Sequence, residues 1–384
     1  MEDFIYRRTQ LAETYCRGLL EGGLQNYRSG LFLAAPRRTG KSTFLRGDML
    51  PSLEKHGFVT IYVDLWSDRE VDPSVLISGA VQEKLNVFAD PISKLAKMTG
   101  TEKVTLAGVL SLKLDISPVL PEGVTLSGAL DVLAKASGKP IALVVDEAQH
   151  ALSSEKGSNA MFALKSARDT LNLAGQPLNL ALVFTGSNRD KLANLTLDHK
   201  QPFYGVQIQR FTLLDKDFAR EFVKHYSREL TGSKRLDVEA VYRAFCTLGF
   251  KPERLVNAAR AAAHTFLETS EKDINRLLIE AAEEIKTKED EHMREKLLGL
   301  TQQQRAVFEV LVRHHANFAP YKDSTLEEYK KFLGKPIGKN SVQSALEALR
   351  EKGLVWKESF GGYVLEDENY VTLFGSNSQN DKVS

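Results

Sequence analysis

Four short runs of apolar residues stand out in the first half of the chain. They cover residues 30–35, 58–65, 139–148 and 178–187, and each is nearly continuous in Val, Ile, Leu, Ala and Phe. Runs without polar alternation are typical of parallel strands that are buried on both faces of a sheet. Helical stretches separate the runs. The pattern therefore predicts an α/β fold around a parallel sheet, with the functional edge at the carboxyl ends of the strands.

Residues 101–120 depart from this order, because apolar and polar side chains alternate there as in an antiparallel hairpin. We interpret them as an insertion between the second and third predicted strands. From about residue 215 the apolar positions recur with helical spacing, and residues 283–300 read as a charged, solvated connecting helix. An α-helical region therefore follows the α/β core.

Residues 301–370 form a third region of three helical segments and two short strands that a Gly-rich turn joins. This order resembles a winged helix-turn-helix. The predicted organisation is a P-loop ATPase core (1–214), a helical lid and connector (215–295), a winged-helix domain (296–374) and a polar, disordered tail (375–384).

Charge and cysteine content exclude several classes of protein. The 51 basic and 50 acidic residues give a net charge of +1, so a nucleic-acid surface would have to be a local patch. No apolar run approaches the roughly 20 residues that cross a bilayer, and the first ten residues lack a signal sequence. Cys16 and Cys246 lie far apart, which indicates two reduced, buried thiols. We expect a cytoplasmic protein.

The first apolar run ends in a small basic loop with the sequence A-P-R-R-T-G-K-S-T, after which a helix begins. Gly40 lets the main chain approach phosphate oxygens, Lys41 suits the β- and γ-phosphates, and the Ser42 hydroxyl is a ligand for Mg²⁺. Ala35 replaces the usual Gly, and an Ala before Pro favours an extended start to the loop. A chance Gly-Lys-Ser at a helix start is the alternative. The predicted nucleotide-binding residues are Ala35, Pro36, Arg37, Arg38, Thr39, Gly40, Lys41, Ser42 and Thr43.

Two carboxylates, Asp146 and Glu147, end the third apolar run. Asp146 is expected to hold hydrated Mg²⁺ together with Ser42, and Glu147 to orient or deprotonate the attacking water. A strand that ends in Asp-Glu is common by itself. With the phosphate loop upstream, the pair predicts a nucleotide-hydrolysing site where the first and third strands end side by side.

Further candidate catalytic residues lie just after the fourth apolar run and in the first turn of a later predicted helix. Asn188 is the first choice for the polar group that holds the water, with Thr185 and Ser187 as alternatives. Arg189 is a candidate charge sensor or intersubunit arginine, unless this segment is only a polar turn that caps a helix. Arg254 could contact the γ-phosphate from the lid, or it could be an ordinary surface arginine.

In this order, the segments APRRTGKST, LVVDEAQH, FTGSNRDKL, QPFYG and GFKPERL resemble prokaryotic AAA+/STAND ATPases, in particular the archaeal-type group related to origin-recognition initiators. The resemblance extends from about residue 4 to residue 374. It implies a P-loop core, a helical lid and a winged helix, with ATP and Mg²⁺ as cofactors. It also implies the roles above for Lys41, Ser42, Asp146, Glu147, Asn188 and Arg254. The family's arginine often follows a Tyr-Gly pair directly; this chain has Val206 there, and the nearest arginine is Arg210.

Residues 338–353 are the predicted recognition helix of the winged helix, with Val342, Leu346 and Leu349 facing the core. Glutamates among its lysines leave protein docking as an alternative to DNA binding. The candidate DNA contacts are Lys339, Asn340, Ser341, Gln343 and Ser344, with Lys357 on the wing and Lys330, Lys331 and Lys335 near the DNA backbone.

Together these patterns predict an Mg²⁺-dependent ATPase that couples ATP and ADP states to conformational change or assembly, on double-stranded DNA. A homo-oligomer or a partner protein is a further possibility, and no membrane is involved. The alternatives are a nucleotide switch without significant turnover and a transcription regulator whose winged helix docks DNA or protein. A kinase is disfavoured, because no second substrate pocket is legible in the sequence.

Overall fold

The structure is a computed structural model, and it describes residues 4–22, 25–89, 120, 124–173, 177–187, 189–226, 236–268, 273–357, 362–367 and 369–375. The chain forms two compact units: residues 7–212, and residues 213–384 together with residues 1–6. Almost all of the hairpin predicted at 101–120, and the tail from 376 onward, lie outside the described residues.

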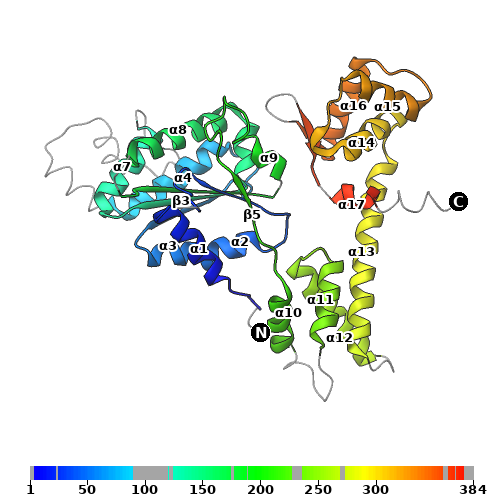
Figure 1. The fold of residues 1–384 in the computed structure, drawn as a ribbon, viewed down its shortest axis with the longest axis horizontal. Helices are drawn as coiled ribbons and strands as arrows, with labels where there is room; N and C mark the ends of the chain where they lie inside the picture. The colour runs from blue at the N-terminus through cyan, green and yellow to red at the C-terminus, as the bar shows by residue number, and fades with distance from the viewer. Residues whose placement is uncertain are drawn as a thin grey trace. The chain divides into compact units, whose positions relative to one another are not determined.

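The first unit is built on a five-stranded parallel sheet with the strand order β2-β3-β4-β1-β5 (Figure 1). The strands are β1 (Leu31–Ala34), β2 (Val59–Asp64), β3 (Ile141–Asp146), β4 (Leu180–Gly186) and β5 (Ile208–Arg210). The four predicted strands and the α/β class are confirmed. β5 was not predicted, because this short edge strand is not fully buried and needs no continuous apolar run.

The strand order corrects one expectation about the site. β4 lies between β1 and β3, so the first and third strands do not end side by side. Their carboxyl ends are two strand spacings apart, about 10 Å. Side chains at the end of β4 therefore stand between the two predicted halves of the site.

Helices cover both faces of this sheet, because alternate residues of each strand point to opposite sides. In β1, Phe32 packs in one core cluster and Leu33 in the other. One face carries α4 (Pro73–Val87), α7 (Leu126–Ser137) and α8 (Glu155–Leu171), and the other carries α1 (Thr9–Leu20) and α3 (Leu50–Lys55). The result is a three-layer sandwich.

The helix after the phosphate loop is continuous but not uniform. It begins as α2 (Lys41–Phe44), widens into the π-helical turn η1 (Leu45–Met49) and continues as α3. π-turns are rare and occur mostly as short bulges inside α-helices, frequently at functional sites. Phe44, Leu45 and Met49 are buried against the sheet, so apolar packing holds the turn in place.

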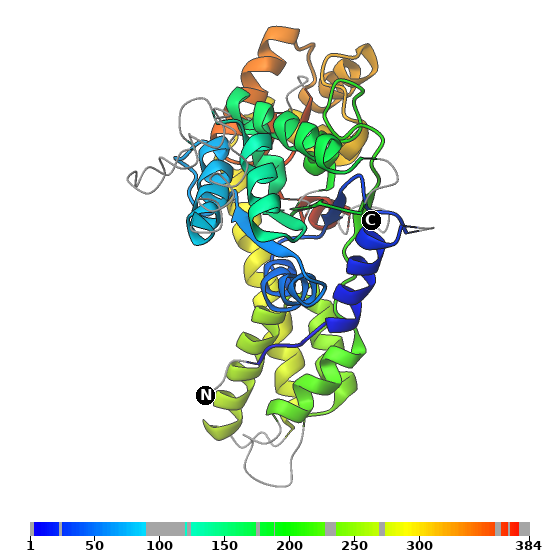
Figure 2. The same cartoon turned by 90° about the vertical axis from the view of Figure 1, so that its left-hand side faces the viewer.

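The second unit starts with a helical subdomain, as the periodicity predicts. It comprises α10 (Lys216–Tyr226), α11 (Val238–Thr247), α12 (Pro252–Glu268) and the 25-residue α13 (Ile274–Leu298) (Figure 2). Asp237 and Asp273 cap α11 and α13. Phe4 packs on Phe218 and Phe222, which ties the start of the chain to this subdomain.

The rest of the second unit has the element order expected of a winged helix. It contains α14 (Gln302–His314), the short η4 (His315–Asn317), α15 (Asp323–Leu333), α16 (Lys339–Glu351), the antiparallel strands β6 (Val355–Lys357) and β7 (Tyr363–Leu365), and α17 (Asn369–Gly375). Val342, Leu346 and Leu349 are fully buried, as the helical spacing predicts. α17 was not predicted.

In the described part of the chain, no helix combines the length and the apolar character that a bilayer crossing requires. Cys16 is buried as expected, but Cys246 is exposed on α11, so the prediction of two buried thiols is wrong for Cys246.

Candidate active site

The phosphate loop leaves β1 in an extended conformation and then turns sharply. The Ala35 N–H donates to the Gly186 carbonyl at 3.1 Å, so Ala35 continues the sheet as the Ala-Pro pair predicts. The Thr39 hydroxyl closes the turn by donating to the Pro36 carbonyl at 2.7 Å. Gly40 has φ of 87°, in the left-handed region that favours glycine.

The amino end of the helix that follows is open. α2 begins at Lys41, and no described side chain caps it. Its first intrahelical bond runs from the Phe44 N–H to the Gly40 carbonyl at 2.9 Å, so the N–H groups of the preceding residues have no intrahelical acceptor. Such N–H groups, together with the helix dipole, favour a bound phosphate.

The acidic pair meets the phosphate loop across the end of β4. Lys41 Nζ lies 2.8 Å from Glu147 Oε1 and 4.0 Å from Asp146 Oδ1. The Ser42 hydroxyl donates to Asp146 Oδ2 at 2.7 Å. The two motifs thus form one cluster although their strands are not neighbours.

Glu147 is held in an ionised, oriented state. Burial acts to raise its pKa, but the ammonium of Lys41 and donors from Ser187 and Gln149 outweigh burial and lower the pKa to about 2. Oε2 accepts the Ser187 hydroxyl at 2.7 Å and the Gln149 amide at 2.5 Å, whereas Oε1 accepts from Lys41. Its φ of 54° is unusual for a residue with a side chain, and strain of this kind is often kept at functional sites.

Asp146 is almost completely enclosed, with 1% of its side chain exposed. Besides Ser42, it accepts hydrogen bonds from the hydroxyls of Tyr62 and Thr185 and from the Glu147 N–H. Asp64 ends β2 in register with Asp146. Burial and then the charges of Asp146 and Glu147 raise the pKa of Asp64.

These residues fit a magnesium ion. The Ser42 hydroxyl donates a hydrogen bond to Asp146, so the lone pairs of the Ser42 oxygen remain available to a cation. Hard oxygen donors are what Mg²⁺ prefers, and it usually keeps several waters while binding one or two carboxylates and substrate phosphates. Ser42 is thus suited to ligate Mg²⁺ directly, and Asp146 to hold its water shell.

The structure places the residues predicted to hold the attacking water and the two candidate arginines differently. Asn188 lies outside the described residues, whereas the alternatives Thr185 and Ser187 contact Asp146 and Glu147. Arg189 is exposed at the start of α9 (Arg189–Ala193). Arg254 belongs to the second unit, where its guanidinium pairs with Glu289 of α13.

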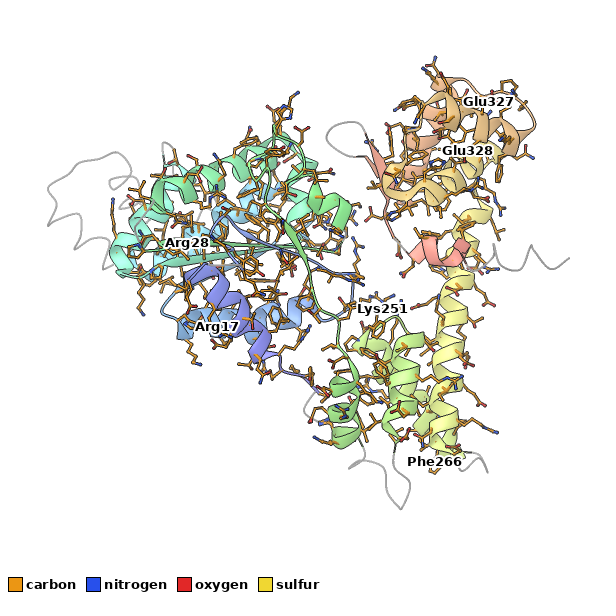
Figure 3. The ribbon with its side chains drawn as sticks, viewed as in Figure 1. Arg17, Arg28, Lys251, Phe266, Glu327 and Glu328 are labelled. Atoms are coloured by element: carbon orange, nitrogen blue, oxygen red, sulfur yellow. The ribbon has the colours of Figure 1, made fainter. Side chains whose placement is uncertain are left out.

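Lys251, one turn before Arg254, is 8% exposed, and Figure 3 labels it near the start of α12. Burial and then the charge of Arg254 lower the pKa of Lys251. This end of α12 therefore carries two closely spaced cations.

Sequence reasoning missed three groups at the site. Tyr62 donates to Asp146, and Gln149 donates to Glu147. Trp66 follows β2, and the guanidinium groups of Arg37 and Arg69 lie 4.6 and 4.5 Å from its ring centre. The available signal was weak: a Tyr inside an apolar strand is normally a core residue.

The candidate DNA contacts differ in accessibility. Lys339, Asn340 and Ser344 are exposed, and Ser341 is half-buried. Gln343 lies in a hydrogen-bond network with Tyr321, Glu347 and Tyr363, so it joins α16 to the hairpin. The side chain of Lys357 lies outside the described part. On α15, where Figure 3 labels Glu327 and Glu328, Lys330 pairs with Glu327, and Lys331 and Lys335 nearby are exposed.

Comparison with known proteins defines the fold. No family model matches the chain, and no curated protein matches its sequence. Among solved structures, the ORC2 protein of Aeropyrum pernix in its ADP form is similar with a TM-score of 0.54 and 13% identity, covering 100% of this chain and 98% of that chain. A Walker-type ATPase of Pyrococcus abyssi is 21% identical with a TM-score of 0.49, covering 97% of this chain and 99% of that chain. The chain therefore has the fold of the A. pernix ORC2 protein, and the α/β P-loop fold predicted from the motifs is confirmed.

Proposed function

We propose that this chain is an Mg²⁺-dependent ATPase that couples its nucleotide state to a change in conformation or assembly on double-stranded DNA. One observation carries the proposal: Lys41 and Ser42 of the phosphate loop contact Glu147 and Asp146 at 2.8 and 2.7 Å. Phosphoryl transfer to water requires a cation, a metal-binding hydroxyl and carboxylates near the phosphates, and these groups gather here at the open end of a helix.

The contacts of Glu147 suggest how the site acts. Lys41 neutralises Oε1, while Ser187 and Gln149 hold Oε2. A bound triphosphate draws Lys41 toward its own oxygens, which frees Oε1 to accept a hydrogen bond from water. Ser187 and Gln149 keep holding Oε2, so the carboxylate stays fixed in direction and orients this water. Mg²⁺ supplies charge neutralisation on the phosphates when bound.

Two further observations support the proposals that the chain binds a nucleotide and that it binds DNA. The A. pernix ORC2 protein, solved as ADPNP–ADP complexes, is similar over the full length of this chain with a TM-score of 0.50. In the second unit, the segment 331–340, from the end of α15 to the start of α16, is basic: Lys331, Lys335 and Lys339 are exposed, and the segment has no acidic residue. A segment of this kind between two helices suits phosphate contact.

The test of the ATPase uses phosphate release and nucleotide binding on the full chain. Glu147→Gln should bind ATP like the wild type but lose turnover, by about 100-fold or more if it removes the water-orienting group. Lys41→Ala should weaken ATP binding itself. Glu70→Gln, at an exposed position of the same unit, is the matched control. Wild-type turnover by Glu147→Gln contradicts the assignment, and ATP binding without phosphate release by the wild type favours the nucleotide switch.

The test of DNA binding uses fluorescence anisotropy with a labelled duplex at several salt concentrations. Lys335→Glu and Lys339→Glu should weaken binding and flatten its salt dependence, because each removes a phosphate contact. Lys352→Glu, exposed at the other end of α16, is the control of equal charge change. Equal affinity of all three variants and the wild type favours protein docking by this unit.

A further inference from the structure

One of the residues that hold the Asp146 carboxylate, Tyr62, lies outside every motif identified in the sequence. Tyr62, from β2, donates its hydroxyl to Asp146 Oδ2 at 3.0 Å, and the Ser42 hydroxyl donates to the same oxygen at 2.7 Å. Oδ1 accepts from the Thr185 hydroxyl and from the Glu147 N–H, the latter at 3.1 Å. The four donors are divided between the two carboxylate oxygens, two on each.

The four donors fix the carboxylate in rotation. Three of them come from elements other than β3: the phosphate-loop helix, β2 and β4. Ser42 can keep its hydrogen bond to Oδ2 while its lone pairs face a cation, but only if Oδ2 stays where it is. Removing the donor on the β2 side leaves Oδ2 with Ser42 alone and permits the carboxylate to turn.

Tyr62 is itself held in place by the helix on the other side of the site. The guanidinium of Arg46 lies 4.7 Å from the centre of its ring. Arg46 belongs to the π-turn η1, and its guanidinium lies over the ring of this β2 residue. The phenol hydroxyl of Tyr62 has one proton to donate, and it donates it in the hydrogen bond to Asp146.

We propose that Tyr62, clamped by Arg46 of the π-turn, is a positioning residue of the metal site. Its hydroxyl holds Asp146 so that the Ser42 oxygen is presented to Mg²⁺. The inference rests on the proposed function, because it assumes that a metal–nucleotide complex occupies the site. In this inference Tyr62 supports binding of the metal and not of the phosphates. Loss of the Tyr62 hydroxyl should therefore raise the Mg²⁺ concentration that the protein requires and leave nucleotide binding without metal intact.

The experiment measures equilibrium binding of a fluorescent ATP analogue to the full chain, in EDTA and across an Mg²⁺ titration. Loss of a group that orients a metal ligand typically lowers metal affinity 10–100-fold. Tyr62→Phe should therefore raise the Mg²⁺ concentration for half-maximal effect at least about 10-fold, with unchanged affinity in EDTA. Tyr27→Phe, a buried tyrosine of the same core cluster, is the matched control.

A second variant keeps the inference testable if Tyr62→Phe fails to fold. Arg46→Met leaves the hydroxyl but removes its clamp, and it should shift the Mg²⁺ requirement in the same direction by a smaller factor. Unchanged Mg²⁺ titrations of Tyr62→Phe, or of Arg46→Met where only that variant folds, overturn the inference while the proposed function stands. Equal weakening in EDTA and in Mg²⁺ also overturns it, since Tyr62 would then support the phosphate loop. Absence of nucleotide binding by the wild type overturns both.

Discussion

The ion pair between Lys41 and Glu147 gives a quantitative prediction for the nucleotide-free protein. The two side chains are 5% and 15% exposed, and their charged atoms lie 2.8 Å apart. Against the burial of Glu147, Lys41 is the strongest of the groups that lower its pKa to about 2, and breaking a buried ion pair by removing one partner costs about 3–5 kcal/mol. Lys41→Met should therefore cost about 3 kcal/mol of unfolding free energy at pH 7, since it leaves a buried carboxylate without its cation.

A double-mutant cycle isolates this pair. Glu147→Gln in the Lys41→Met background should recover part of the loss, because a neutral amide tolerates burial better than an unpaired carboxylate. The expected coupling energy is about 2 kcal/mol, well within the range for residues in direct contact. ATP with Mg²⁺ should stabilise the wild type and not the Lys41→Met variant.

The assay needs a probe that reports the first unit alone. The chain has two tryptophans, Trp66 beside the site and Trp356 in the second unit. Trp356→Phe leaves Trp66 as the fluorescent reporter, and urea unfolding of all four cycle members is followed in that background. A cost of Lys41→Met below about 0.5 kcal/mol, with no coupling, would refute the reasoning that Lys41 neutralises Glu147.

Three further predictions follow from burial and charge. The stability advantage of the wild type over Glu147→Gln, measured by urea unfolding, should be complete above about pH 4.5 and shrink as the pH falls toward 2, because the folded-state pKa is depressed. A thiol reagent should modify Cys246 rapidly and Cys16 only on unfolding, since burial raises the pKa of Cys16 to about 11; two fast thiols in the native protein would contradict this. Tyr329→Phe should leave the thermal midpoint unchanged or raise it, because no described residue hydrogen-bonds this buried hydroxyl; a clear loss of stability would argue against it.

The sequence predicts the sheet and the two motifs well because both depend on local signals. β1, β3 and β4 are buried along their whole length, so their composition alone identifies them. The phosphate loop combines Gly40 with a cation and a hydroxyl at fixed spacing, and its carboxylate partners end a buried strand. In each case a few neighbouring residues carry the whole signal.

The rest of the site depends on strand order, which cannot be predicted from short stretches of sequence. The position of β4 between β1 and β3 decides that Thr185 and Ser187 reach the acidic pair. The pairing of β2 with β3 decides that Tyr62 reaches Asp146. Contacts between residues that are 39 and 84 positions apart follow from the assembled sheet and not from periodicity.

The intervening strand also determines what kinds of mutation can widen or narrow the site. The distance between the phosphate loop and the acidic pair is set by two backbone hydrogen-bond ladders, β1 with β4 and β4 with β3. Ladder spacing hardly responds to side-chain volume, so cavities made in the core should weaken folding without misaligning the reacting groups. Insertions or deletions within β4 act differently: they shift both ladders at once and separate the two halves even where the protein still folds.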